Sequence, residues 1–471
     1  MSQQRSLMDI IYVSSAAALV YWVLLAIYRV YLSPLSRIPG PRLAALTYWY
    51  ETYYEVYKGG QYFRMIDNMH GKYGPIVRIT PNEVHFEDPT FNDVLYPSLG
   101  KRKIDRPGLE PILQDHMERM LFRMQESGTQ CEVVELHYIF KACASDIITL
   151  YAFGDSFHFL DQSDYGVPYF RAGEAFNSMT HVFGAFPWLL TVASSAPGWL
   201  LKYLNPDMAE FVDRREWWIE KVRDIRNSKA PERAKNTIFG GILDSSLPPE
   251  DKTDMRLANE AQLVVFAGEG TTAIFHLLSK PGILQKMKEE LAAVVSDGRE
   301  VPTFQQMDKL RYMNAIINEA IRLHPGAMHR QVRVCPNDAI VYVDKERGAE
   351  YVVPPGTVYG TSPLTSHMNE SVFKDPYEFI PERWIDNPEI SKAFMGFSRG
   401  TRGCVGITLA RRELSTTLAT IFLKYDLYQG QQGPTLELYD TIRARDIDAA
   451  RDYISPLPTK GSFGLRVRIR N

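Results

Sequence analysis

The pattern of apolar and polar positions divides the chain into an apolar amino-terminal segment and a long mixed body. Residues 10–28 (IIYVSSAAALVYWVLLAIY) carry no charge and are bracketed by Asp9 and Arg29. A helix of this length just spans a hydrocarbon core of about 30 Å. A cleaved signal peptide would have a shorter apolar core and a small-residue cleavage site. We therefore interpret residues 1–33 as a single-pass membrane anchor.

The charges around this segment predict its orientation. Arg5 stands before it, whereas Arg29, Arg37 and Arg42 follow it, so the body is expected on the cytosolic side. The next stretch, SPLSRIPGPR (33–42), contains three prolines and cannot continue a helix. We expect it to form a stiff, extended spacer between the anchor and the body.

The body is predicted to be mainly helical, with small sheets. Helical periodicity runs through residues 43–70, 109–218, 257–295, 305–323 and 407–427. Alternating or β-branched segments predict strands at 75–86, with a turn at Pro81-Asn82, at 338–361 and at 463–470. Because no linker, charge block or repeat divides the chain after residue 60, we predict one domain over residues 34–471.

Composition narrows the class of protein. A hydrophobic content of 45% with 12% aromatic residues supports a large core and excludes a disordered polymer. The net charge of −3 does not indicate a nucleic acid or another polyanion as partner. Cys131, Cys143, Cys335 and Cys404 lie far apart, which argues against a disulfide framework or a structural zinc site and favours a reducing compartment. A single functional thiol remains open.

The most specific motif lies at residues 397–406, FSRGTRGCVG. It reproduces every fixed position of FxxGxRxCxG, the heme-binding loop of cytochromes P450, which this chain therefore resembles. The plainer interpretation is a lone buried cysteine acting as a small hydrophobe. Five fixed positions arise by chance in a chain of this length roughly once in ten thousand. We therefore favour the heme loop.

The resemblance implies the cytochrome P450 fold, mainly α with small β-sheets, and heme b whose iron is axially ligated by Cys404. A thiolate ligand pushes electron density onto the iron and favours O–O cleavage. Cys404 precedes the helix predicted at 407–427, where the helix dipole stabilises negative charge. The nearest likeness is to fungal, membrane-anchored members that act in specialised metabolism.

Other residues receive cofactor-binding roles through the same resemblance. Gly400 and Gly406 would let the backbone turn and approach the porphyrin. Phe397 would shield the sulfur from water. Arg402 matches a position that pairs with a heme propionate. Arg333 matches a second such position; the alternative, a surface arginine, is less favoured because arginine pairs readily with carboxylates.

Two further motifs support the resemblance. Glu319 and Arg322 form ExxR and share one helix face, and residues 381–384 (PERW) resemble the element that supplies a third partner, Arg383. In the family these three residues form a buried ion network that is structural rather than catalytic. Residues 326–330 would line the substrate pocket.

A third motif, AGEGTT at 267–272, resembles the oxygen-activating stretch of the central helix. Thr271 would take part in a catalytic proton relay. The acid that precedes the threonine in the family is replaced here by Gly270, and the carboxylate stands one residue earlier, at Glu269. One residue is about 100° around a helix, so Glu269 is either a displaced catalytic acid or a solvated helix charge.

The chain is short in two places. After residue 107 the expected helix with a WxxxR or HxxxR motif is missing, about forty residues in all, which exceeds ordinary loop variation. After residue 273 about seven residues, close to two helical turns, are missing. Either the protein has lost these pieces or the reading frame omits them.

The leading hypothesis is an NADPH- and O₂-dependent monooxygenase of the endoplasmic reticulum membrane that oxygenates an apolar small molecule, such as a terpenoid or polyketide. A flavoprotein reductase would supply electrons at the Cys404 face, which Arg399, Arg402, Arg411 and Arg412 would make positive. One alternative is a heme-thiolate isomerase or dehydratase that needs no reductase. Another is a catalytically impaired heme-binding protein, because of the two short places.

Overall fold

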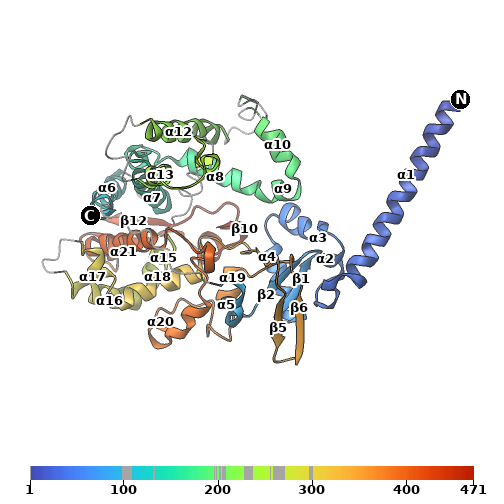
Figure 1. The fold of residues 1–471 in the computed structure, drawn as a ribbon. Coiled ribbons are helices and arrows are strands. Elements are labelled where there is room, and N and C mark those ends of the chain that lie inside the picture. The colour runs from blue at the N-terminus through green and yellow to red at the C-terminus, as the bar shows by residue number, and fades with distance from the viewer. Residues whose placement is uncertain are drawn as a thin grey trace.

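The computed structural model consists of one projecting helix and a body in which helices surround several small sheets (Figure 1). It describes residues 2–97, 109–130, 133–195, 197, 199–200, 203, 208–227, 237–254, 256–257, 271–295 and 301–470. The predicted fold class, mainly helical with small sheets, is confirmed.

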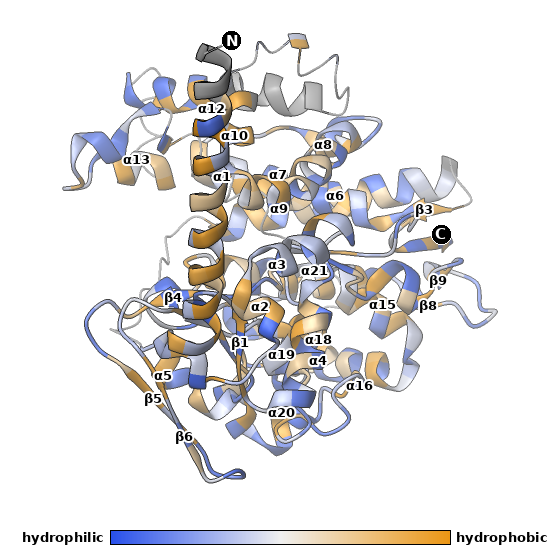
Figure 2. Cartoon of the chain, turned by 90° about the vertical axis from the view of Figure 1, so that its right-hand side faces the viewer, coloured by the Kyte–Doolittle hydropathy of each residue, from blue (hydrophilic) through white to orange (hydrophobic). Residues whose placement is uncertain are grey.

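The projecting helix is the predicted apolar segment. Helix α1 (Ser2–Ile27) continues into the π-helical turn η1 (Tyr28–Leu32). Residues 8–32 have a mean hydropathy of 2.2 and are not buried by the body, so this helix is long and apolar enough to cross a membrane. Most of it is coloured as hydrophobic in Figure 2. Its end is tied to the body, because Arg29 Nη1 donates to the carbonyl of Leu46 at 2.8 Å and Arg78 Nη1 donates to the carbonyl of Arg29 at 2.8 Å.

The proline-rich stretch differs from the free spacer that the sequence predicts. Pro34–Arg37 forms the 3₁₀ turn η2, and Leu35 and Ile38 are buried in the core beside the first sheet. The amide of Arg78 donates to the carbonyl of Pro39 at 2.7 Å. The prolines do prevent a continuous α-helix, but the apolar residues between them bind the stretch to the body.

The single helix expected over residues 43–70 is broken into α2 (Arg42–Leu46), α3 (Trp49–Thr52), the π-helical turn η3 (Tyr53–Tyr57) and α4 (Tyr62–Tyr73). Gly59 and Gly60 separate η3 from α4 with φ angles of 74° and 69°. A Cβ on Gly60 would lie 2.3 Å from the carbonyl oxygen of Asp452, so the break also lets the carboxy-terminal hairpin approach.

The strands form small sheets, as predicted. β1 (Ile76–Thr80) and β2 (Glu83–Phe86) are antiparallel and turn at Pro81-Asn82, and β7 (Val358–Gly360) and β4 (Arg333–Val334) complete their sheet in the order β1-β2-β7-β4. A second sheet has the order β3-β12-β9-β8, with bounds Val134–Glu135, Arg466–Arg470, Thr435–Leu438 and Asp426–Leu427. Two hairpins are formed by β5 (Ile340–Asp344) with β6 (Ala349–Val353), and by β10 (Arg451–Tyr453) with β11 (Ser455–Leu457).

The largest core lies among the long helices of the body. These are α6 (Leu109–Gln130), α7 (Leu136–Phe153), α8 (Val167–Ser178), α12 (Met208–Arg226), α15 (Thr271–Ser279), α16 (Pro281–Ala292), α18 (Arg311–Leu323) and α21 (Ile407–Lys424). Shorter helices are α5 (Asn92–Leu95), α9 (Thr180–Ala185), α10 (Pro187–Ser195), α13 (Ile238–Leu243), α17 (Phe304–Met307), α19 (Pro363–His367) and α20 (Arg383–Asp386). The body also contains one further π-helical turn, η10 (Arg443–Ile447), among its described residues. Its short 3₁₀ turns are η4 (Pro89–Phe91), η5 (Phe159–Asp161), η7 (Pro249–Lys252), η8 (Pro388–Ala393) and η9 (Gly400–Arg402). On α21 Leu418 and Ile421 are fully buried, whereas Ile407, Ala410 and Leu414 are only partly buried.

Candidate heme site

The cysteine loop runs from Met395 to Gly406 and delivers Cys404 to the start of α21. The amide of Ser398 donates to the carbonyl of Met395 at 2.9 Å, and the amide of Cys404 donates to the carbonyl of Phe397 at 2.8 Å. These bonds fold the loop back on itself. Gly406 is the N-cap of α21, two residues after Cys404, so the thiol lies at the positive end of a helix of 18 residues, as predicted.

The thiol of Cys404 is held ready for a cation. Cys404 is exposed, and the backbone N–H of Gly406 lies close enough to the sulfur to lower the pKa of the thiol. The loop atoms that cover the other side of the sulfur raise the pKa of the thiol above its ordinary value, and the Gly406 amide partly opposes this by lowering the pKa. Because the loop alone does not favour the thiolate, a metal ion bound at the sulfur would have to supply the remaining stabilisation.

The two predicted glycines have different surroundings. Gly400 adopts φ 71°, and a Cβ there would lie 2.9 Å from the carbonyl oxygens of Tyr96 and Pro97. A glycine is therefore required by the protein itself. At Gly406 a Cβ would meet only the sulfur of Cys404, at 3.9 Å. Among the described residues, nothing else lies within 4 Å of that Cβ position, so Gly406 leaves room beside the sulfur for a bound group.

Arg333 lies next to this loop, as the resemblance implies. Its guanidinium stacks over the ring of Tyr96, 5.0 Å from the centroid, and Tyr96 is the residue whose carbonyl contacts Gly400. The side chains of Gln331 and Ser398 form a hydrogen bond that also joins the two segments. Among the described residues, Arg333 has a hydrogen bond only to the carbonyl of Val332 and has no carboxylate partner.

Arg402 is exposed and forms no hydrogen bond or ion pair with any residue that the structure describes. The four-arginine positive patch is only partly present, and this prediction needs correction. Arg399 Nη2 is paired with Asp93 Oδ1 at 2.6 Å, and Arg411 Nη2 donates to Asn318 Oδ1 at 2.7 Å. Arg412 lies over the ring of Phe304, 4.6 Å from its centroid. The ion pair with Asp93 offsets the charge of Arg399, whereas an amide hydrogen bond and a stacked ring leave the charges of Arg411 and Arg412 in place.

The predicted ion network beside the loop is confirmed. Arg322 Nε and Nη2 donate to the two carboxylate oxygens of Glu319, each at 2.8 Å, and neither side chain is exposed. Arg383 Nε donates to Glu319 Oε1 at 3.1 Å. The indole of Trp384, the last residue of the PERW element, donates to Glu319 Oε2 at 2.9 Å. One carboxylate therefore joins α18 to the start of α20.

His367 connects this network to the loop, and the sequence carried no signal for it. Nδ1 of His367 donates to the carbonyl of Arg322 at 2.9 Å, and Nε2 accepts the amide of Met395 at 2.8 Å. Burial first, and then the charge of Arg322, lowers the pKa of His367 to about 3. The ring is therefore neutral at neutral pH, as its acceptor role requires.

Of the predicted catalytic pair, only Thr271 can be placed. It begins α15 and is buried, and its hydroxyl forms no hydrogen bond with a described residue. Helix α18 contacts both α15, which Thr271 begins, and α21, which follows the cysteine loop. Glu269 lies outside the described residues.

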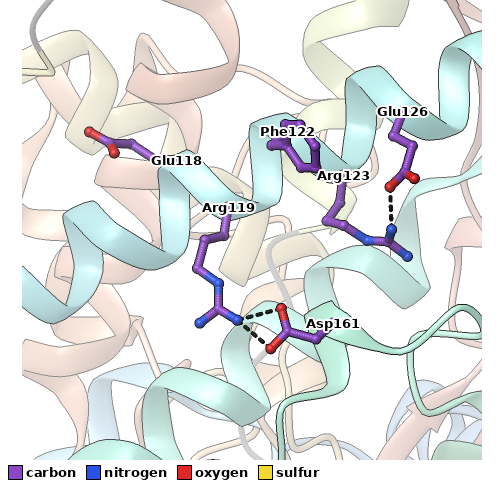
Figure 3. Close-up of a pocket in the computed structure, with 6 residues that line it drawn as sticks. All are labelled: Glu118, Arg119, Phe122, Arg123, Glu126 and Asp161. Carbon is purple, nitrogen blue, oxygen red and sulfur yellow. Dashed lines mark hydrogen bonds and ion pairs between the residues drawn. The ribbon is translucent and has the colours of Figure 1, made fainter.

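A depression along α6 is not this site. It is lined by Glu118, Arg119, Phe122, Arg123, Glu126 and Asp161 (Figure 3). It is open to solvent, and its charged groups form pairs with one another, Arg119 with Asp161 and Arg123 with Glu126. None of the predicted site residues lines it.

Comparison with known proteins agrees with this geometry. The family model described as Cytochrome P450 matches residues 92–441. The cytochrome P450 monooxygenase tpcC of Cochliobolus heterostrophus is 32% identical and covers 95% of both chains. The tryptophan 6-hydroxylase fscE of Fusarium equiseti is 32% identical over 95% of this chain and 94% of its own. The cytochrome P450 monooxygenase sdnE of Sordaria araneosa is 32% identical over 95% of this chain and 96% of its own.

The alignments also bear on the two short places. The alignment with tpcC has 499 positions, more than the 471 residues of this chain, although it covers only 95% of the chain. This relative therefore has residues, roughly 50 of them, that have no counterpart here. This number is close to the sum of the two expected gaps, about forty residues after residue 107 and about seven after residue 273. The chain belongs to the cytochrome P450 family of heme-thiolate monooxygenases.

Proposed function

We propose that this protein is a monooxygenase that uses heme b ligated by Cys404 to insert one oxygen atom from O₂ into an apolar small molecule. The observation that carries the proposal is the cysteine loop. It places an exposed thiol at the start of α21, and a Cβ at the neighbouring Gly406 would meet no atom of a described residue within 4 Å other than the Cys404 sulfur. Bound heme would supply the redox and oxygen chemistry there.

The chain's own residues would bind and orient this group. Cys404 would hold the iron, and Phe397 and Gly406 would border the sulfur. Arg333 and Arg402, which have no acidic partner among the described residues, would each pair with a propionate. Thr271 would pass protons at its hydroxyl through ordered water, and Glu269 is the candidate for the acid behind it.

We further propose that the electrons come from NADPH through a membrane-bound flavoprotein reductase. Residues 1–33 would anchor the chain in the endoplasmic reticulum membrane, with residues 34–471 facing the cytosol. The charge pattern around α1 supports this orientation. We expect the substrate to be a specialised metabolite, such as a terpenoid or polyketide, as the resemblance implies.

The test is the substitution Cys404→Ser, with Cys335→Ser as the matched control, because Cys335 is also a free and partly exposed cysteine. A hydroxyl cannot supply the thiolate ligand. The variant C404S should lose the red-shifted Soret band of the reduced, carbon monoxide-bound protein and all turnover, whereas C335S should keep both. An unchanged band in C404S would contradict the assignment of Cys404.

The missing residues favour a second candidate, a catalytically impaired heme-binding protein. The helix absent after residue 107 would have carried a third propionate partner. A wild-type chain without any carbon monoxide-reactive heme would support this candidate. The third candidate, a reductase-independent isomerase or dehydratase, predicts turnover without NADPH, and the retained Thr271 argues against it.

A further inference from the structure

Four segments that are distant in the sequence bring two histidines and two carboxylates together, away from the cysteine loop. Glu55 comes from η3, His181 from α9, His329 from the stretch between α18 and β4, and Asp452 from β10. Each of the first three offers one ligand atom, and these atoms lie within 4.8 Å of one another. In Figure 1 these segments meet on the side of the body that carries α1.

Hydrogen bonds fix the backbone around the cluster. The amide of Asp452 donates to the carbonyl of Gly60 at 2.9 Å, and the amide of Met328 donates to the carbonyl of Ile454 at 3.0 Å. Oδ2 of Asp452 lies 2.8 Å from Nδ1 of His329. This bond leaves the other ring nitrogen of His329 free for a ligand, as carboxylates do for metal-binding histidines.

Glu55 is the residue in this cluster whose charge a bound cation would neutralise. It is 4% exposed, and neither of its carboxylate oxygens has a hydrogen-bond partner. The backbone amide of Tyr62 lies close enough to lower the pKa of the Glu55 carboxyl, but it does not form a hydrogen bond of ordinary geometry with it. A buried carboxylate without partners costs several kcal/mol, so its charge must be neutralised by a proton or by a bound cation. Burial raises the pKa of Glu55 to about 8, which expresses the same need.

The nearest arginine does not meet that need. Arg330 Nε donates to Glu83 Oε1 at 2.9 Å, and its Nη2 is paired with Glu51. Only Nη1 faces Glu55, at 3.6 Å, which is too long for a hydrogen bond. One guanidinium thus stands among three glutamates, with Asp452 close by, and the local charge is negative.

The imidazole of His181 completes the donor set. Its Nε2 lies 3.4 Å from Glu55 Oε2, close to the ligand separation expected around a tetrahedral zinc ion with bonds of about 2.0–2.1 Å. Burial lowers the pKa of His181, so the ring is neutral and able to bind a metal. Nε2 now contacts the carbonyl of Asp452 at 2.5 Å, a contact that metal binding would replace.

We propose that Glu55, His181 and His329 form a binding site for a divalent transition-metal ion, zinc, in which Asp452 orients His329. Two imidazoles and a carboxylate are a donor set that zinc prefers. The bound ion would neutralise Glu55 and would cross-link α9 to the amino-terminal segment and to the loop after α18. The proposal uses none of the heme-loop residues, but His329 belongs to residues 326–330, which the resemblance assigns to the substrate pocket.

The test uses the full chain with its heme, without a polyhistidine tag, after chelation and dialysis against zinc at pH 7.5. The wild type should bind one zinc per chain and should unfold at a higher temperature with zinc than without. The variants Glu55→Gln and His181→Asn should lose the thermal shift and should bind zinc about 10-fold or more weakly. The control His158→Asn removes a histidine that lies beside Asp155 and Asp161 on the surface, and it should behave as the wild type.

Zinc X-ray absorption on the wild type gives a result that does not depend on the folding of any variant. We expect N/O ligands at about 2.0–2.1 Å with imidazole scattering, whereas a Zn–S distance of about 2.3 Å would place the metal on a cysteine and overturn the proposal. The proposal is also overturned if the wild type takes up no zinc, or if E55Q and H181N bind it as the wild type does. Absence of uptake would mean that a proton neutralises Glu55.

Discussion

Replacement of Glu319 by glutamine should destabilise the body far more than any surface ion pair can. Glu319 is fully buried and accepts hydrogen bonds from Arg322, Arg383, Trp384 and the amide of Ile380. Glutamine has the same shape, but it carries no charge. Its side-chain NH₂ group replaces one carboxylate oxygen and would face N–H groups that also donate. The guanidinium of Arg322, which has no exposed surface, keeps only the carbonyls of His367, Pro376 and Glu378. Breaking a buried pair on one side costs about 3–5 kcal/mol.

The matched control is Glu382→Gln, because the Glu382 carboxylate is accessible to solvent. Its carboxylate pairs with Lys286 at 2.7 Å, with side-chain exposures of 35% and 57%. Such a pair contributes at most about 1 kcal/mol. Urea unfolding should be followed by tryptophan fluorescence and by the Soret band. If E319Q and E382Q unfold within about 1 kcal/mol of each other, the buried network does not hold the body as argued.

Three further predictions concern catalysis, the anchor and pH. Thr271→Ala should keep NADPH consumption but form more peroxide and less product, which is measured as the ratio of product and peroxide to NADPH consumed. If this ratio is unchanged, protons are delivered by another residue, and Glu269 is the next to test. Deletion of residues 2–27 leaves the contacts of Arg29 in place and should move the protein from the membrane pellet to the supernatant. The truncated protein should still bind a carbon monoxide-reactive heme. Complete loss of heme would contradict a separable anchor. Burial lowers the pKa of His367 to about 3, whereas the pKa of an unfolded histidine is about 6.5. The neutral ring therefore contributes its full stabilisation to the folded state above pH 6.5. Between pH 6.5 and pH 3 only the unfolded state binds the proton, so the free energy of unfolding falls by about 1.4 kcal/mol for each pH unit. The stability difference between the wild type and His367→Asn in urea should therefore narrow below pH 6.5, and a constant difference from pH 7 to pH 5 would refute this.

Local chemistry made some of the fold and site predictable. Pro81-Asn82 between alternating segments predicted the β1–β2 turn, and the periodicity after Gly406 predicted α21. The ExxR spacing placed Glu319 and Arg322 on one face, and the structure pairs them. In each case the deciding interaction is between near neighbours in the sequence or follows from a motif of several fixed positions.

Features that depend on distant partners escaped prediction. The helix expected over 43–70 is interrupted at Gly60 because the hairpin at Asp452 needs that space. His367 looks like an ordinary polar residue until Arg322 and Met395 meet its two nitrogens. The cluster of Glu55, His181 and His329 consists of single residues from three distant segments, and none of them carries a local metal-binding spacing.

The two arginines near the cysteine loop indicate what the shortened chain has kept. Most arginines around them are engaged, for example Arg399 with Asp93 and Arg322 with Glu319. Arg333 and Arg402 have no carboxylate partner among the described residues, although both flank the face left open beside Gly406 and Cys404 in sequence or contact. An unpaired guanidinium near such a face is available for a carboxylate that the protein does not itself supply. If heme binds at Cys404, we therefore expect Arg333 and Arg402 to pair with its propionates.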